Sequence, residues 1–127
     1  MKKLLPSLLS LALLLGAAVC AQAQTAPTLT PPQAQQQLAK SGTVLLDVRT
    51  PAEFAAGHLR GARNVNFLST DFADQVAKLD PTATYVLYCK SGNRSTQAGT
   101  LMLQKGFKNV VNAGGFEALK AGGLAAE

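Results

Sequence analysis

The sequence contains few of the side chains that bind metal ions or nucleic acids. Its 127 residues include one histidine, two cysteines and no tryptophan, and aromatic residues make up 6% of the chain. A single histidine and so few cysteines do not form a ligand set, so we expect neither a metal site nor a cofactor. The 12 basic residues are scattered, without basic runs or interleaved aromatics, which argues against nucleic-acid binding.

The one long apolar run lies near the N terminus. Lys2 and Lys3 precede a mostly apolar run over 8–19, and a small-x-small motif follows at 21–23. This order is that of a secretory signal peptide, and the run is too short for a membrane span. We therefore predict a cleaved signal peptide over residues 1–23, a periplasmic location and no membrane span.

Cys20 allows a second interpretation of the same segment, as the lipid-bearing cysteine of a lipoprotein. The preceding residue, Val19, argues against it, because a lipoprotein signal has a small residue there. If Cys20 leaves with the signal peptide, Cys89 has no partner for an intramolecular disulfide. A lone thiol in an oxidising compartment is unusual and indicates a chemical role.

The rest of the chain alternates between strand and helix patterns. Residues 24–30 are polar and contain proline, so we predict a linker or disordered arm there, followed by one domain over 31–127. Predicted strands cover 43–48, 62–67, 85–89 and 108–112. Two predicted helices begin after the capping residues Thr30 and Thr50, and two more cover 69–79 and 95–105. A last predicted helix begins at Gly114 and Gly115. This alternation predicts an α/β fold with a central parallel sheet and helices on both faces.

Cys89 ends the predicted strand 85–89 and is followed by a short polar loop and a helix. Such a unit points backbone N–H groups and the positive end of the helix at the sulfur. Lys90 and Arg94 add two cations, so we expect a thiolate whose pKa is lowered from ~8.5 towards roughly 3.5–7.5. The alternative is a buried structural thiol, since free cysteines are often buried.

Three segments resemble the motifs of rhodanese-like domains. They are DVRTPAEF at 47–54, continued by GHLRGA at 57–62 and by Asn64, then CKSGNR at 89–94, and GGFEA at 114–118. The resemblance covers residues 30–124 in the family's order and implies the rhodanese-like α/β fold. The chain departs from the family pattern at Leu119, where tryptophan is common, and at Arg60, where proline is frequent.

The resemblance implies a sulfurtransferase that carries sulfane sulfur as a persulfide on Cys89. A small anion such as thiosulfate would donate the sulfur, and a thiol, cyanide or a protein would accept it. The implied site comprises the catalytic residues Cys89 and Arg94 and the substrate-binding residues Lys90, Ser91, Gly92, Asn93 and Ser95. Arg94 is expected to clamp the oxygens of the leaving sulfite.

Two alternatives stay open. One is a persulfide carrier or thiol-binding module with little turnover. The other is an arsenate reductase or phosphatase, but the family members with those activities have a loop one residue longer than the six residues from Cys89 to Arg94. The length of this loop therefore favours sulfur transfer.

Other residues of the motifs have structural explanations. Asp47 and Arg49 are expected to form a salt bridge at the end of a strand rather than to orient the loop. Glu53 is expected to complete the cap of a helix that begins after Thr50. His58 follows the end of that helix, where a hydrogen bond that fixes the fold is a better explanation than a general base.

Overall fold

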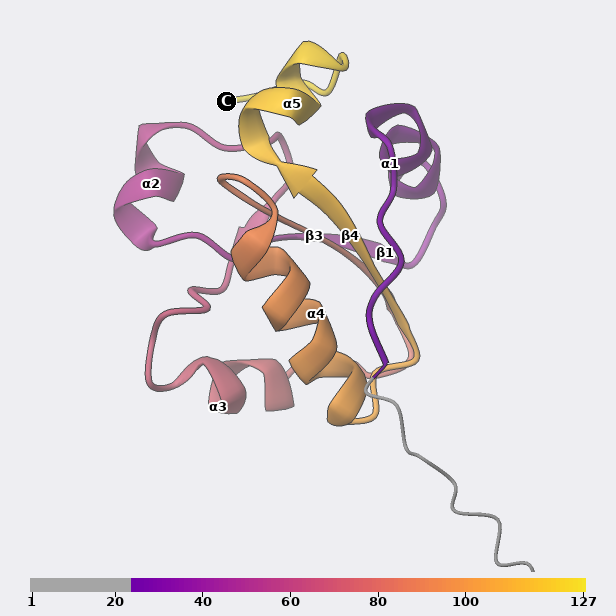
Figure 1. The fold of residues 1–127 in the computed structure, drawn as a ribbon, viewed down its shortest axis with the longest axis vertical. Coiled ribbons are helices and arrows are strands. Elements are labelled where there is room, and N and C mark those ends of the chain that lie inside the picture. Colours follow the sequence, from indigo (N-terminus) through magenta and orange to yellow (C-terminus); the bar gives the residue numbers. More distant parts are fainter. Residues whose placement is uncertain (1–23) are drawn as a thin grey trace, which may run out of the picture.

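The fold is a four-stranded parallel sheet between two layers of helices (Figure 1). The computed structural model describes residues 24–127, and the predicted signal peptide with Cys20 lies outside the described residues. The strands are β1 (Thr43–Asp47), β2 (Arg63–Asn64), β3 (Thr84–Cys89) and β4 (Asn109–Gly115). They lie in the order β2-β1-β3-β4, and every neighbouring pair is parallel. The predicted α/β class with a central parallel sheet is confirmed.

Helices cover both faces of this sheet. They are α1 (Pro31–Leu38), α2 (Pro51–Ala56), α3 (Phe72–Ala77), α4 (Asn93–Gln104) and α5 (Phe116–Ala121). The longest, α4, has 12 residues, and no helix in the described part of the chain is long and apolar enough to cross a membrane.

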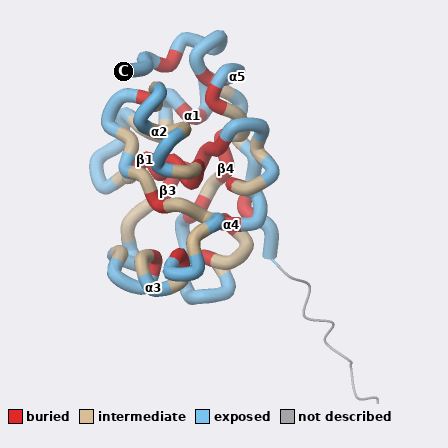
Figure 2. The backbone as a smooth tube through the Cα atoms, turned by 90° about the vertical axis from the view of Figure 1, so that its left-hand side faces the viewer, coloured by how far each residue is buried: buried red, intermediate tan, exposed pale blue. Residues whose placement is uncertain are grey.

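The side chains of β3 alternate between the two layers. Tyr85 and Leu87 pack with residues of α3 and α4, whereas Val86 and Tyr88 pack with residues of α1 and α5. Figure 2 shows that the buried residues gather along the central strands. A strand covered on both faces needs apolar side chains at every position, which explains the unbroken apolar pattern before Cys89.

Both predicted helix caps are present. Thr30 and Gln33 exchange side-chain and backbone hydrogen bonds at the start of α1, and Thr50 and Glu53 do the same at the start of α2. In each helix a proline occupies the first turn, where its missing N–H group costs nothing. These local signals place the starts of two helices correctly.

The end of β4 differs from the prediction. Gly114 and Gly115, expected to open the last helix, instead extend β4 and pair with Tyr88 and Cys89 after a bulge. A Cβ atom on Gly115 would lie 2.7 Å from the carbonyl oxygen of Lys90, so only glycine lets the strand come this close to the loop. The two glycines therefore support the loop that follows Cys89.

Other boundaries shift by a few residues. The strand predicted over 62–67 is reduced to Arg63–Asn64, and α3 begins three residues later than the predicted 69–79. Helix α4 begins at Asn93 rather than at Ser95, because Gly92 turns the loop sharply with a φ of 97°. Each of these segments is nevertheless of the predicted type.

Residues 24–30 lie along the free edge of β4, in contrast to the predicted linker or disordered arm. The N–H of Leu29 donates to the carbonyl of Asn112 at 2.8 Å, and the N–H of Asn112 donates to the carbonyl of Pro27 at 2.8 Å. Ala26 is buried against α4, where a Cβ atom on Gly99 would approach it to 3.0 Å. Figure 1 shows this segment beside β4 before the chain enters α1. The edge of the sheet is thereby partly covered.

Candidate active site

The side chain of Cys89 lies in a turn of backbone at the carboxyl end of β3. Cys89 is fully buried. Its Sγ accepts a hydrogen bond from the N–H of Gly92 at 2.9 Å and lies 3.4 Å from the hydroxyl of Ser95. The turn is short because α4 begins at once, so the backbone N–H groups of the loop face the sulfur. Cys89 is the one free cysteine among residues 24–127.

These hydrogen bonds favour the thiolate. Burial acts in the opposite direction and raises the pKa of Cys89, but the donors outweigh it and the pKa lies below its ordinary value. The donors are the Ser95 hydroxyl and the backbone N–H groups of Ser95, Ser91 and Gly92. The sequence predicted the direction of the shift and the role of the backbone N–H groups, and the structure adds the hydroxyl of Ser95 as a donor.

The hydroxyl of Ser95 has two acceptors and one hydrogen. It lies 3.4 Å from Sγ of Cys89 and 3.0 Å from the carbonyl oxygen of Gly92. A neutral thiol is a weak acceptor, whereas a thiolate attracts the hydrogen strongly. Ser95 can therefore respond to the charge on the sulfur without moving its backbone.

The other predicted site residues take different positions. Lys90, Ser91 and Asn93 are exposed around the loop. The side-chain oxygen of Asn93 accepts a hydrogen bond from Gln97 at 3.4 Å, along the surface of α4. Of the predicted substrate-binding residues, Gly92 and Ser95 thus contact the sulfur most closely, and Ser91 contributes through its backbone.

Arg94 forms an ion pair that no sequence pattern predicted. Its Nη1 lies 2.7 Å from Oε1 of Glu53, and its Nη2 lies 2.9 Å from Oε2. Both terminal nitrogens, the predicted clamp for sulfite oxygens, are therefore bonded to a carboxylate from α2. The pKa of Glu53 is lowered to about 2, mainly by its hydrogen bonds with Arg94. Burial opposes this shift, and the hydrogen bonds with Thr50 add to it. Because the local cap fully explained Glu53, nothing in the sequence pointed to Arg94.

The predicted salt bridge at the end of β1 is present and buried. Nη2 of Arg49 lies 2.6 Å from Oδ2 of Asp47, and the two side chains are 6% and 0% exposed. The same Nη2 donates to the carbonyl of Gly57 at 2.7 Å, and the guanidinium lies 4.4 Å from the ring centre of Phe116. These contacts join β1, α2 and α5 around the carboxyl end of the sheet.

His58 makes contacts that hold the chain together after α2. Its ring stacks on Phe54 with 3.7 Å between centroids, and its Nδ1 lies 2.9 Å from the carbonyl oxygen of Phe54. Its Nε2 lies 3.4 Å from the carboxylate of Glu127, and the backbones of the two residues are also hydrogen-bonded. These contacts agree with the structural role that the sequence favoured.

Asn112 is a supporting residue that sequence reasoning missed. It is buried, its Nδ2 donates to the hydroxyl of Thr96 at 2.9 Å, and its Oδ1 accepts from the N–H of Gly114 at 2.9 Å. Thr96 in turn donates to the carbonyl of Gly92 at 2.7 Å. A polar residue at the end of an apolar predicted strand was the available signal.

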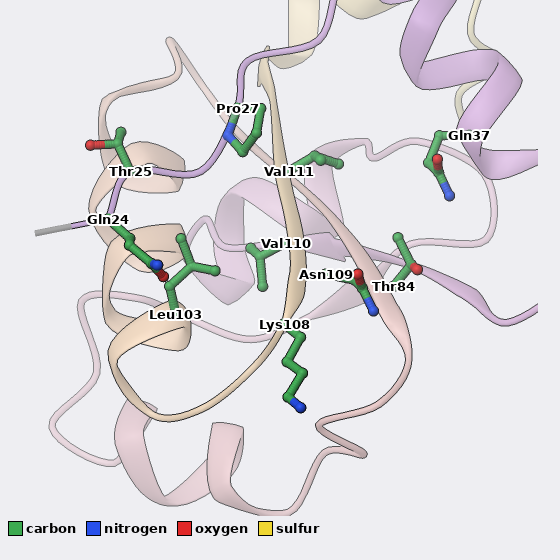
Figure 3. A pocket seen from close by; sticks show the side chains of 10 residues that line it. All are labelled: Gln24, Thr25, Pro27, Gln37, Thr84, Leu103, Lys108, Asn109, Val110 and Val111. Atoms are coloured by element: carbon green, nitrogen blue, oxygen red, sulfur yellow. The ribbon is translucent and has the colours of Figure 1, made fainter.

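A cavity of about 510 Å³ lies beside the loop, lined in part by Lys90, Glu53, Arg49 and Phe116. A second cavity, of about 560 Å³, lies between β4 and the N-terminal segment (Figure 3) and contains none of the predicted site residues. Leu119, at the position of the family's tryptophan, lines neither of these cavities and is fully buried in the core. Over residues 24–127, no three His, Cys, Asp or Glu side chains gather in a possible metal site.

Comparison with known proteins decides the family. The model of the rhodanese-like domain matches residues 30–122. The chain belongs to the rhodanese-like domain family. Its predicted family membership and fold are therefore confirmed.

Its curated relatives in this family include bacterial sulfurtransferases. The chain is 38% identical to thiosulfate sulfurtransferase GlpE of Pseudomonas aeruginosa (strain LESB58) over 87 residues, 68% of this chain and 77% of that protein. It is also 38% identical to GlpE of Pseudomonas putida (strain F1) over 92 residues, 72% of this chain and 82% of that protein. The rhodanese-like domain of Anabaena protein Alr3790 superposes with a TM-score of 0.71 at 25% identity, covering 80% of this chain and 78% of that structure. The predicted enzyme class, a sulfurtransferase, is confirmed by these relatives.

Proposed function

We propose that this sulfurtransferase is exported and moves sulfane sulfur from thiosulfate to a thiophilic acceptor through a persulfide on Cys89. Thiosulfate is the donor named for the Pseudomonas relatives. The acceptor is cyanide in an assay, and a small thiol or a protein thiol in the cell. Export to the periplasm is proposed from the N-terminal sequence, which resembles a cleaved signal peptide.

The proposed reaction has two balanced steps. The Cys89 thiolate attacks the outer sulfur of thiosulfate and forms a new S–S bond. The S–S bond of thiosulfate breaks, and sulfite leaves with the electron pair, so that the enzyme carries a persulfide anion. Cyanide then attacks the outer sulfur, thiocyanate leaves, and the Cys89 thiolate is restored. No external oxidant, reductant or proton is needed, and the covalent intermediate divides the transfer into two displacements.

The observation that carries the proposal is the set of hydrogen-bond donors around one sulfur. The N–H of Gly92 and the hydroxyl of Ser95, with the backbone N–H groups of Ser91 and Ser95, lower the pKa of Cys89 against the effect of burial. The same donors suit a persulfide anion, whose charge also lies on sulfur. A purely structural thiol has no need of them.

Sulfur loading and turnover test the proposal separately. Wild-type protein mixed with thiosulfate should gain one sulfur atom in intact mass spectra under non-reducing conditions, and cyanide or a thiol should remove it. Cys89→Ser, which preserves the size of the side chain, should neither load nor turn over. Failure of the wild type to load would reject both the enzyme and the carrier interpretation.

A persulfide carrier with slow turnover is the second candidate, and one observation favours it. The whole of Cys89 is buried, so a donor reaches the sulfur only after some part of the surrounding loop moves. If sulfur loads and cyanide-dependent turnover is negligible, the carrier is the correct interpretation. A steady-state rate far below the single-turnover rate of sulfur loading would indicate the carrier, and similar rates would indicate the enzyme.

Cell fractionation tests the proposed export. The periplasmic fraction should contain a soluble form that begins near Gln24, identified by N-terminal sequencing. The retained segment would then include the residues that lie along β4. A membrane-bound, acylated form that begins at Cys20 would reject this proposal in favour of a lipoprotein.

A further inference from the structure

Arg94 and Glu53 form an end-on ion pair with two parallel hydrogen bonds. Both terminal nitrogens of Arg94 are bonded to both oxygens of Glu53, at 2.7 and 2.9 Å. Paired, charge-assisted bonds of this kind are among the stronger hydrogen bonds in proteins. An oxyanion that binds Arg94 end-on, through both terminal nitrogens, would compete with Glu53 for them.

Glu53 is also held from its own helix. Its Oε1 lies 3.0 Å from the hydroxyl of Thr50 and 3.3 Å from the N–H of Thr50, as part of the cap of α2. The carboxylate is ionised at any physiological pH, since its pKa is lowered to about 2. An oxyanion therefore competes with a fixed, charged group whose position is set by a second element of the fold.

From these contacts we propose that Glu53 is a specificity-determining residue that competes with oxyanions for Arg94. In the resting site the fork of Arg94 is occupied, so the loop does not hold a phosphate or arsenate ion by paired hydrogen bonds. The N–H of Gly92 and the hydroxyl of Ser95 face the sulfur instead. The site thus disfavours phosphoryl or arsenate chemistry that needs an oxyanion held end-on by Arg94, whereas attack of Cys89 on a sulfane sulfur does not need that contact. The proposal deepens the proposed function and rests on it for the reaction at Cys89.

Because Arg94 is paired with Glu53, the first cation available to a substrate anion is Lys90. Lys90 is exposed, lines the cavity of about 510 Å³ beside the loop, and forms no ion pair with any residue between 24 and 127. The sulfonate group of thiosulfate can interact with Lys90 without displacing Glu53. Specificity then depends on which cation is free, not only on the length of the loop.

Phosphate binding tests the competition without any turnover. Inorganic phosphate is titrated into the purified protein, and affinity is read from amide chemical shifts of the loop in a heteronuclear NMR experiment. Glu53→Gln keeps the size of the side chain and its contacts with Thr50, but it removes the charge that holds Arg94. This variant should bind phosphate about tenfold more tightly than wild type. Glu53→Gln combined with Arg94→Gln should lose that gain.

Two further variants make the result specific. Glu117→Gln removes an equal charge near the same cavity, where Glu117 pairs with Lys120 at 3.2 Å, and it should change phosphate affinity by less than about twofold. Arg94→Gln alone should bind phosphate as weakly as wild type, because the fork is already occupied. This variant keeps the proposal testable if Glu53→Gln does not fold.

Three results would overturn the proposal: no gain in Glu53→Gln, a gain that persists without Arg94, or a large loss in Arg94→Gln alone. Failure of the proposed function is a different result. In that case thiosulfate would not load sulfur onto Cys89, whatever the phosphate titrations show. The two measurements therefore fail independently.

Discussion

Two arginine–carboxylate pairs near the active site have similar bond lengths and different surroundings. Asp47 and Arg49 are 0% and 6% exposed and lie two residues apart at the end of β1, and Arg49 also donates to the carbonyl of Gly57. Glu53 and Arg94 are 29% and 19% exposed and join α2 to α4 across 41 residues of sequence. The first pair is closed off from water, whereas solvent and ions can reach the second.

This difference in exposure determines what each pair can do. Removing one partner of a buried pair leaves an uncompensated charge in a dry environment, so Asp47 and Arg49 are part of the framework. A partly exposed pair gains less from its attraction, because water and salt screen it and can replace either partner. Glu53 and Arg94 are therefore suited to exchange with a ligand, which the first pair cannot do.

The largest expected effect is on the buried pair. Arg49→Ala leaves the carboxylate of Asp47 buried without its partner, and the free energy of unfolding should fall by about 3–5 kcal/mol. Urea denaturation followed by circular dichroism measures it. Arg63→Ala, which removes an exposed arginine from β2, is the control and should change stability little. A loss below about 1 kcal/mol in Arg49→Ala would show that burial does not distinguish the two pairs.

The next effect concerns Arg94 in catalysis. Arg94→Ala should lower kcat/KM for thiosulfate by about tenfold or more, because it removes a cation that interacts with the charge on Cys89. Arg94→Lys should keep most of the activity, since the charge remains and the fork is already occupied by Glu53. This expectation differs from the sulfite clamp predicted from the sequence alone.

Kinetics of both folded variants decide between the two roles of Arg94. If the lysine variant loses as much activity as the alanine variant, the planar fork itself contacts the substrate. Glu53 would then have to release Arg94 during each turnover. Such a result would favour the clamp and would make the pair a moving part of the mechanism.

The fold was largely predictable because its signals are local. Capping residues and prolines marked the starts of α1 and α2, and the apolar run before Cys89 marked β3. The glycines of the third motif were assigned to the wrong element, because glycine is rare inside strands. Their place in β4 depends on close contact with the loop after Cys89, a tertiary constraint.

The position of Cys89 and its loop was predictable from the sequence, whereas the residues that support them were less so. Cys89 and the donors of its loop follow from one continuous stretch of sequence. The Glu53–Arg94 pair joins distant segments, and Asn112 links Thr96 to Gly114, so neither leaves a local pattern. A residue with a complete local explanation, such as Glu53, can still have a second partner that only the fold reveals.

A smaller effect tests whether neutral hydrogen-bond donors, rather than cations, stabilise the thiolate of Cys89. Ser95→Ala removes a hydroxyl near the sulfur and should raise the pKa of Cys89. The rate of alkylation by iodoacetamide, measured against pH, should shift its midpoint upwards accordingly. Thr96→Ala is the matched control, because its hydroxyl is bonded to the carbonyl of Gly92 and not to the sulfur. Equal shifts in both variants would mean that the loop geometry, and not the Ser95 donor, sets the pKa.

The smallest expected effect is the contribution of the exposed pair to stability. The pKa of Glu53 is lowered from 4.5 to about 2 in the folded protein, chiefly by Arg94. A lowered pKa means that the folded state favours the charged form, so the stabilisation is complete above pH 4.5 and is lost as the pH falls towards 2. Because solvent screens this pair, the whole contribution should not exceed about 1 kcal/mol.

Unfolding free energies at pH 7 and pH 3 should therefore differ less in Glu53→Gln than in wild type, whereas the exposed-pair control Glu117→Gln should behave as wild type. Identical pH dependence in all three proteins would mean that Arg94 does not hold the Glu53 carboxylate in solution, and it would remove the basis for treating Glu53 as a competitor of substrate anions.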